Sequence, residues 1–214
     1  METASRDYHE DDIRAGRVGA MMVDDPRKNN ELQKVAVEES RLGIPLLIGF
    51  DVIHGLRSVY PIAIAEAGTF DEKLFEETAR VAARESRAYG INWNFAPMID
   101  VARDARWGRV SEGPGEDPYL AACFARAKIR GLQNNTKGRE YFVAACLKHY
   151  AAYGACESGR DYNTVDMSHV RMFNEYFPPY KAAVDAGVDS VMASFNEVDG
   201  VPATGNRWLQ TEVL

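Results

Sequence analysis

Short apolar runs alternate with longer amphipathic segments along this chain, and this alternation constrains its fold more than any other feature. The apolar runs cover residues 18–23, 44–50, 92–96, 143–147 and 190–194. Continuous apolar runs of this length, bounded by turn-forming residues, are typical of the buried strands of a parallel sheet. The alternation of strand and helix patterns therefore predicts an α/β fold.

Helix signals occupy the intervals between the apolar runs. Residues 30–41 carry apolar side chains at helical spacing and are followed by Gly43. The sequence Thr69-Phe70-Asp71-Glu72 has the pattern of a capping box and predicts a helix that reaches Tyr89. Further helices are predicted to start at Asp117-Pro118, at Ser168 (ended or bent by Pro178-Pro179) and at Lys181 (ended by Gly187).

Two closures of the sheet fit this pattern, an open doubly wound sheet and a (β/α)8 barrel. No GxGxxG or GxxxxGK[ST] motif follows any of the predicted strands, so the nucleotide-binding form of the open sheet has no motif support. The predicted strands are too few to close an eight-stranded barrel. If the sheet is of the barrel type, the chain therefore holds an incomplete barrel.

Charge and composition exclude several classes of function. The formal net charge is -7 and the isoelectric point about 5.2, with no cluster of Lys and Arg, so we expect neither nucleic acid nor an anionic membrane as a partner. No run approaches the roughly 18 apolar residues of a membrane span, and residues 1–12 lack the apolar stretch of a signal peptide. The three cysteines contain no CxxC pair, which argues against a disulfide framework and a zinc site. We expect no metal and no cofactor.

Polar residues gather just after the ends of several predicted strands. They are Asp51, His54, Asp100, Arg103, Asp104, Arg106, Trp107, Arg109, Lys148, His149 and the segment 194–197. In a barrel the carboxyl ends of the strands share one face, and active sites form on that face. Residues far apart in the sequence are therefore expected to converge around one pocket.

The mixture of these side chains suits a carbohydrate, because a sugar ring presents adjacent hydroxyl groups that both donate and accept. The Asp51 carboxylate can accept hydrogen bonds from two neighbouring hydroxyls. Arg109, Lys148 and His149 can donate to hydroxyl oxygens. The residues by themselves indicate a polyhydroxylated small ligand, allow a glycosidase, and go no further.

Aromatic side chains and structural alternatives complete this interpretation. Trp107 or Phe195 can meet the apolar C–H face of a sugar or line its rim. Asp51 can instead cap a helix or pair with an arginine, and Lys148-His149 can be a satisfied structural pair. Two further groups are most simply structural: a salt-bridge network of Arg103, Asp104 and Arg106, and the loop or cap residues Glu112, Glu116 and Asp117.

Five segments carry a resemblance to a known family. They are GFDVIHG at 49–55, NFAPMIDVARDARWGR at 94–109, SEGPGEDPY at 111–119, LKHYAAYG at 147–154 and DYNTVDMS at 161–168. In this order and spacing they resemble family 3 glycoside hydrolases, in particular the periplasmic β-glucosidases of Gram-negative bacteria. The branch of N-acetylglucosaminidases carries a proline and a second histidine after Lys-His, and both are missing from the stretch that follows Lys148-His149.

The resemblance implies an incomplete (β/α)8 TIM-type barrel with roughly the first five strand–helix units. Residues 1–17 are then a polar N-terminal segment, and residues 18–214 are part of the family 3 N-terminal barrel domain. The complete enzyme of this family has a second α/β domain. Its nucleophile is an aspartate in a strand expected beyond Leu214, and its acid/base glutamate lies in the second domain, so the isolated chain is expected to be inactive.

The resemblance also implies the function and the site. The parent protein is expected to be a retaining, exo-acting β-glycosidase of the β-glucosidase type, periplasmic or secreted, that acts on a small carbohydrate from its non-reducing end. The residues expected to bind that sugar are Asp51, Arg109, Lys148, His149 and, through its shape, Phe195. Alternatives are a non-catalytic sugar-binding fragment, half of a split enzyme, or an unrelated α/β enzyme. An unclosed barrel is expected to self-associate or to need the remainder of the enzyme as a partner.

Overall fold

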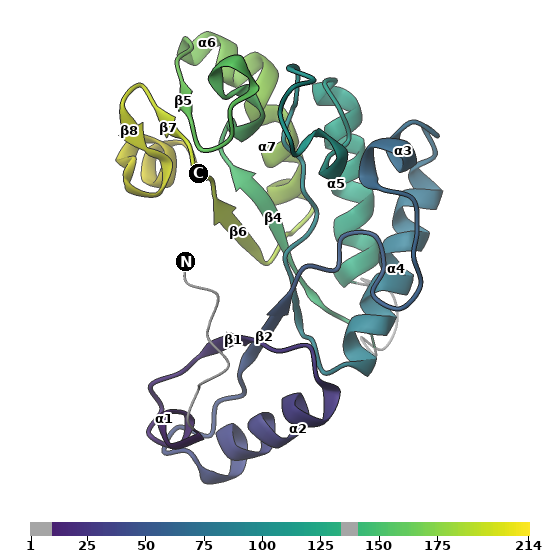
Figure 1. The fold of residues 1–214 in the computed structure, drawn as a ribbon, viewed down its shortest axis with the longest axis vertical. Helices are drawn as coiled ribbons and strands as arrows, with labels where there is room; N and C mark the ends of the chain where they lie inside the picture. The colour runs from purple at the N-terminus through teal and green to yellow at the C-terminus, as the bar shows by residue number, and fades with distance from the viewer. Residues whose placement is uncertain (1–9, 134–140) are drawn as a thin grey trace.

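Five parallel strands form the central sheet of the protein (Figure 1). The structure, a computed structural model, describes residues 10–133 and 141–214. The strands follow the sheet order β1-β2-β3-β4-β6, and each lies beside the next parallel strand in the chain. Their bounds are β1 Ala20–Met22, β2 Leu47–Phe50, β3 Trp93–Asn94, β4 Ala144–Tyr150 and β6 Ser190–Ala193. This arrangement is half of an α/β barrel and confirms the predicted fold class.

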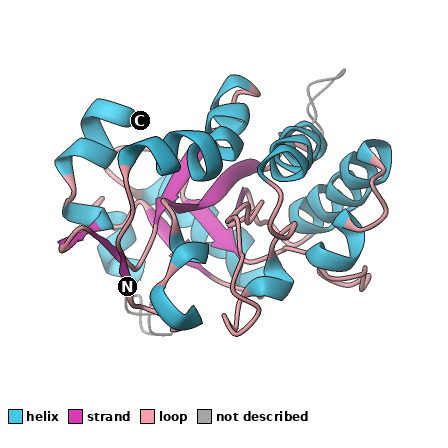
Figure 2. Cartoon of the chain, turned by 90° about the horizontal axis from the view of Figure 1, so that it is seen from above, coloured by secondary structure: helices cyan, strands magenta, loops and turns pink. Residues whose placement is uncertain are grey.

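Helices cover the outer face of the sheet. Seen from above, the strands lie at the centre with helices around them (Figure 2). Helices α4, α5 and α7 pack side by side along the strands, and α2 lies beside β1 and β2. Their bounds are α1 Glu10–Arg14, α2 Pro26–Lys34, α3 Ala63–Ala67, α4 Glu72–Ala88, α5 Pro118–Gln133, α6 His169–Arg171 and α7 Phe177–Asp185. No helix in the described ranges is long and apolar enough to cross a bilayer.

The main core lies between these helices and the strands. Ile48 of β2 and Leu147 of β4 are fully buried there, together with Ile129 of α5. These are residues of the apolar runs and of the helical stripes, so the pattern in the sequence identified the core correctly. Cys123, Cys146 and Cys156 are free and buried, as expected from their spacing.

The start of α4 differs from the expected capping box. Asp71 is the N-cap, and its carboxylate accepts hydrogen bonds from the backbone N–H groups of Lys73 and Leu74. The Thr69 hydroxyl instead accepts from the N–H of Asp71, so it orders the turn before the helix. At the other end Gly90 has φ +76° and packs against Asn29, where a Cβ atom would lie 2.9 Å from the Asn29 Cβ, so glycine suits this position.

The starts of two other helices differ from those predicted, and each of these helices has proline in its first turn. Helix α2 begins at Pro26 with Asp25 as its N-cap, earlier than residue 30, and ends in a π-helical turn at Val35–Glu39. The helical stretch capped by Ser168 ends in a π-helical turn at Tyr176, just before Pro178 and Pro179. Helix α7 follows at once from Phe177 with both prolines in its first turn, and not from Lys181 as predicted. Asp117 caps α5 as predicted, because its carboxylate accepts a hydrogen bond from the N–H of Leu120.

Strand β4 is longer than predicted, and this matters for the site. Its pairing with β6 continues to Tyr150, so Lys148 and His149 are strand residues rather than residues that follow the strand. The neighbouring strand, not the apolar run, sets where β4 ends. A second sheet of β5 Thr164–Val165, β7 Glu197–Val198 and β8 Val201–Pro202 was not predicted, because strands of two residues have no periodic pattern.

Candidate active site

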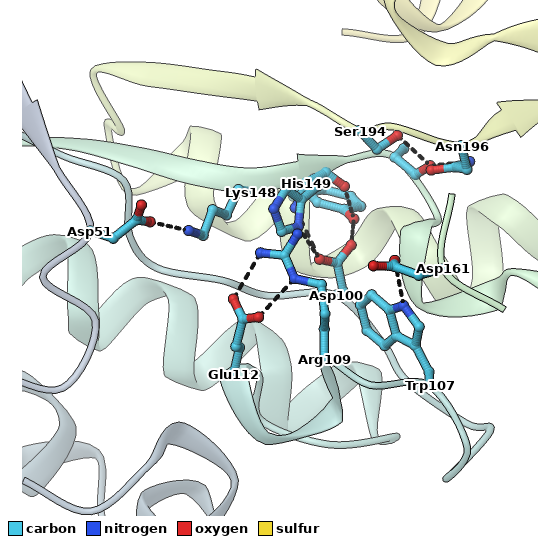
Figure 3. A network of polar contacts seen from close by, with 12 residues as sticks. Asp51, Asp100, Trp107, Arg109, Glu112, Lys148, His149, Asp161, Ser194 and Asn196 are labelled. Carbon is cyan, nitrogen blue, oxygen red and sulfur yellow. Dashed lines mark hydrogen bonds and ion pairs between the residues drawn. The ribbon is translucent and has the colours of Figure 1, made fainter. Parts of the chain in front are cut away.

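Lys148 and Asp51 form an ion pair across the sheet. Lys148 comes from β4 and Asp51 directly follows β2, and the Nζ–Oδ1 distance is 2.5 Å (Figure 3). The Lys148 side chain is 4% exposed, whereas the Asp51 side chain is 48% exposed. The carboxylate of the pair therefore faces solvent, and the ammonium group of Lys148 lies buried beneath it. A buried charge is costly unless it is paired, so Lys148 needs the Asp51 carboxylate.

The position of Asp51 is fixed by the residues around it. Asn94, buried at the end of β3, accepts a hydrogen bond from the N–H of Val52 and donates one to its carbonyl, both at 2.9 Å. The Glu85 carboxylate of α4 accepts from the N–H groups of Leu56 and Arg57 further along the same loop, at 3.0 and 2.8 Å. These contacts hold the start and the middle of the loop that runs from Asp51 to α3.

His149 is oriented by the buried carboxylate of Asp100. Its Nδ1 lies 2.8 Å from Asp100 Oδ2, and its backbone N–H donates to the same oxygen at 3.1 Å. The single proton of the Tyr180 hydroxyl is shared between two acceptors, the His149 carbonyl oxygen at 2.7 Å and Asp100 Oδ1 at 3.0 Å. Burial, with the Asp100 charge beside it, raises the pKa of Tyr180 well above its ordinary value. Because a carboxylate only accepts, Nδ1 carries the proton and Nε2 is the ring atom left for a ligand.

Arg109 is held by Glu112 in a two-point ion pair. Its Nε and Nη2 donate to the two carboxylate oxygens of Glu112 at 2.7 and 2.8 Å. Burial would lower the pKa of Arg109, but this pair more than offsets it and the pKa lies above its usual range. Burial would likewise raise the pKa of Glu112, yet Arg109, and to a smaller extent Lys148 and His149, hold it below its ordinary value.

Glu112 therefore belongs to the cluster, although it was predicted to be a structural loop or cap residue. Its carboxylate holds the Arg109 guanidinium at two points, and Figure 3 shows it among the side chains of the cluster. Its spacing of three residues from Arg109, in the short 3₁₀ turn Val110–Glu112, is the signal that could have revealed the pair.

Tyr153 forms the buried centre of the aromatic side of the site. Its ring centroid lies 5.2 Å from those of His149 and Trp107 and 5.9 Å from that of Phe195, and the Arg109 guanidinium lies 5.6 Å from it. Its hydroxyl makes no hydrogen bond within the described residues. Burial, and secondarily Asp161, raises the pKa of Tyr153 above its ordinary value.

Trp107 cannot serve as a sugar platform, which corrects one of the two aromatic options. Its side chain lies under the site, 2% exposed, and its Nε1 donates to Asp161 Oδ1 at 3.1 Å. Phe195 is 51% exposed and lies 6.3 Å from the His149 ring, so it alone of the two has a ring face open to solvent. The residues packed around each ring, rather than the type of aromatic residue, therefore determine which ring can meet a ligand.

The structure brings the predicted sugar-binding residues together. Lys148 is bonded to Asp51 and is next in sequence to His149 (Figure 3). Arg109 and Phe195 both lie against the ring of Tyr153. Other polar residues near the strand ends stay outside this cluster. Arg106 forms an ion pair with Asp104, as predicted for a structural network, whereas Arg103 pairs with Glu175. The side chains of His54 and Glu116 are exposed.

The cluster offers hydrogen-bond donors, acceptors and an apolar ring face around one place. This set of groups matches a ligand with many hydroxyls. No group of three or more His, Cys, Asp and Glu side chains in residues 10–133 and 141–214 is arranged to hold a metal ion.

Sequence comparison identifies a family for the chain. Residues 2–214 match the family described as glycosyl hydrolase family 3 N terminal domain. The chain belongs to this family. Family 3 relatives include the periplasmic β-glucosidase of Salmonella typhimurium, 44% identical over 94% of this chain, and a β-xylosidase of Formosa agariphila, 38% identical over 100% of it. The chain spans only 26% and 31% of the lengths of these two proteins.

Solved family 3 structures share the fold. The β-glucosidase of Listeria innocua in complex with glucose is 42% identical, with a TM-score of 0.87 over 91% of this chain and 28% of its own. An exo-1,3/1,4-β-glucanase from a Pseudoalteromonas species is 27% identical, with a TM-score of 0.90 over 97% of this chain and 29% of its own. These findings confirm the predicted family and the barrel-type architecture, and they place the chain among glycoside hydrolases.

Proposed function

We propose that this chain supplies the sugar-binding subsite of a retaining, exo-acting β-glycosidase of the β-glucosidase type. The observation that carries the proposal is the convergence of Asp51, Arg109, Lys148 and His149, which come from three stretches of sequence, around one place in the half-barrel. The names of the relatives support a β-glucoside or a β-xyloside as the substrate. In the proposed site these four residues grip the hydroxyls of the non-reducing-end sugar.

Each of the four has a donor or acceptor left for the sugar. Glu112 engages Nε and Nη2 of Arg109, which fixes the plane of the guanidinium and leaves Nη1 as the group that Glu112 does not hold. Asp51 bonds Lys148 through Oδ1, and its half-exposed side chain offers Oδ2. Hydrogen bonds of this kind can strengthen as the ring flattens toward an oxocarbenium ion, and this preference for the transition state lowers the barrier.

We place the nucleophile and the acid/base outside this chain. A retaining glycosidase needs two carboxyl groups roughly 5–5.5 Å apart, one of which attacks the anomeric carbon. The carboxylates of the cluster are already engaged: Asp51 by Lys148, Asp100 by His149, Glu112 by Arg109 and Asp161 by Trp107. Their pairing suits binding and orientation rather than attack, so the isolated chain is expected not to hydrolyse glycosides.

The remaining features of the proposal concern the whole protein. Residues 18–214 would be the barrel part and residues 1–17 a segment before it. A periplasmic or secreted location is supported by the name of the Salmonella relative. The alternative is a sugar-binding fragment or half of a split enzyme, and it is favoured if the purified chain binds glucose tightly while a second chain restores hydrolysis.

A chimera tests the proposal. The stretch of the Listeria innocua β-glucosidase that matches this chain is replaced by it, and hydrolysis of an aryl β-glucoside is measured. We expect turnover by the chimera and none by the isolated chain. In the chimera, Lys148→Met is expected to lower kcat/KM by about 10- to 100-fold, the size of a lost charged hydrogen bond. Lys181→Met, at an exposed ion pair on α7, is the matched control.

Two results would contradict the proposal. One is turnover by the purified isolated chain, which would require a nucleophile among residues 1–214. The other is a Lys148→Met chimera that is as active as the Lys181→Met chimera while both are folded, as judged by circular dichroism. The second result would remove Lys148 from the sugar-binding residues.

A further inference from the structure

Two exposed aromatic rings lie side by side next to the polar cluster. Tyr162 is 67% exposed and Phe195 is 51% exposed, and their ring centroids are 5.1 Å apart with an angle of 50° between the planes. Tyr162 comes from the segment before β5, and Phe195 follows β6, so the pair is made by tertiary structure. Two large rings that face solvent side by side can both contact the apolar face of one ligand.

The two rings are held in place from below. Both pack on the buried ring of Tyr153, with centroid distances of 6.3 Å from Tyr162 and 5.9 Å from Phe195. The residues on either side of Phe195, Ser194 and Asn196, are buried and donate hydrogen bonds to the carbonyl of Ala151. The Phe195 ring therefore points outward from a fixed backbone.

The segment that carries Tyr162 is fixed as well. Asp161, directly before it, accepts a hydrogen bond from Trp107 Nε1. Just after it, Thr164 donates to the Glu197 carboxylate at 2.6 Å and pairs with the same residue between β5 and β7, which ties this segment to the one that carries Phe195. Tyr162 itself has φ 57°, a left-handed conformation that is rare for a tyrosine, and such conformations cluster at functional sites.

The rings continue the site in one direction. Phe195 lies 6.3 Å from the His149 ring, and Lys148, which bonds Asp51, directly precedes His149 in β4. In Figure 3, Ser194 and Asn196 lie beyond His149 on the side away from Asp51. If the polar residues hold the sugar of a glycoside, the group linked to that sugar would therefore lie over Phe195 and Tyr162.

We propose that Tyr162 and Phe195 form a platform for the group linked to the gripped sugar, and that this group presents a flat apolar face. An aromatic aglycone has such a face, and so does the C–H side of a second pyranose. The inference rests on the proposed function, because it assumes that the polar cluster holds the non-reducing-end sugar. It makes Tyr162 a determinant of specificity on the leaving-group side of the bond.

Binding to the full chain tests the platform without catalysis. The probes are methyl β-glucoside, phenyl β-glucoside and a β-linked glucose disaccharide, with affinities measured by calorimetry or ligand-observed NMR. We expect phenyl β-glucoside to bind about 2- to 10-fold more tightly than methyl β-glucoside, the gain typical of one ring contact. Tyr162→Ala should remove this ratio and leave the affinity for methyl β-glucoside unchanged, and Tyr162→Phe should restore it. The disaccharide shows whether a second sugar ring also binds more tightly than a methyl group.

Controls separate this inference from the proposed function. Tyr119→Ala removes a tyrosine that is 76% exposed from the first turn of α5 and should change neither affinity. Lys148→Met should weaken both glucosides equally, because it acts on the sugar they share. An unchanged ratio in folded Tyr162→Ala overturns the platform while the effect of Lys148→Met still supports the sugar subsite. A chain that binds none of the probes overturns both.

Discussion

The carboxylate of Asp100 accepts two hydrogen bonds from His149, one from the backbone N–H at 3.1 Å and one from the ring Nδ1 at 2.8 Å. Both residues are buried, with side chains no more than 1% exposed. One carboxylate thus fixes the strand and the imidazole that the strand carries. This contact links the stability of β4 to the geometry of the site.

Replacing this carboxylate is expected to destabilise the chain. In Asp100→Asn the amide can accept at only one atom, so a buried donor of His149 or Tyr180 loses its partner. We expect the free energy of unfolding to fall by about 2–3 kcal/mol. Urea unfolding followed by tryptophan fluorescence, at one fixed protein concentration, measures the change. Asp185→Asn, at the exposed end of α7, serves as the control and should change the free energy by less than about 0.5 kcal/mol. Equal effects of the two substitutions would contradict the proposed importance of the contact.

The Lys148–Asp51 pair is expected to show coupling in a double-mutant cycle. Asp51→Asn leaves the buried Lys148 ammonium without its carboxylate, and Lys148→Met removes the charge itself. Because Asp51 is half-exposed, water screens the pair, and we expect a coupling free energy of about 1 kcal/mol. The same unfolding experiment on the two single variants and the double variant gives this number. Additive effects would mean that the two residues act independently.

A buried ion pair outside the site gives a separate test. Lys128 of α5 lies 2.7 Å from both carboxylate oxygens of Glu66 of α3 and 2.9 Å from the Thr78 hydroxyl of α4, which also bonds Glu66. Burial, partly offset by Glu66, lowers the pKa of Lys128. Lys128→Met strands a buried carboxylate and is expected to cost about 3–5 kcal/mol, whereas the double variant Glu66→Leu/Lys128→Met should recover most of this loss. A double variant that is no more stable than the single one would show that the pair itself stabilises the helix contacts.

Acid is expected to weaken the loop that follows Asp51. Burial would raise the pKa of Glu85, but hydrogen bonds from Ser58, Arg57 and Leu56 outweigh it and lower the pKa from 4.5 to about 2. A carboxyl group whose pKa is depressed on folding contributes stability above its unfolded pKa, and this contribution is lost as the pH falls toward the folded value. The stability difference between the natural chain and Glu85→Gln should therefore shrink from pH 6 to pH 2. Urea unfolding midpoints across this range measure it, and a constant difference would exclude Glu85 as the cause.

The site depends on partners that sequence patterns do not reveal. Asp51 and Lys148 are 97 positions apart, and Asn94, which fixes Val52, comes from a third strand. Glu112 was predicted to be a loop or cap residue, and in the structure it forms an ion pair with Arg109. Trp107 and Phe195 were equal candidates for a ring platform until their burial separated them. In each case the deciding quantity was the set of neighbours in space.

The sequence by itself determined the class of fold, the places of the five central strands, the cap of α5 at Asp117 and the family, because apolar periodicity, helix caps and motifs are local features of the chain. The tertiary structure alone decided where β4 ends, which residues form β5, β7 and β8, and which charged groups pair. Strand ends and ion pairs depend on segments that meet only after folding. The local propensity of a segment does not say which other segment will pack against it.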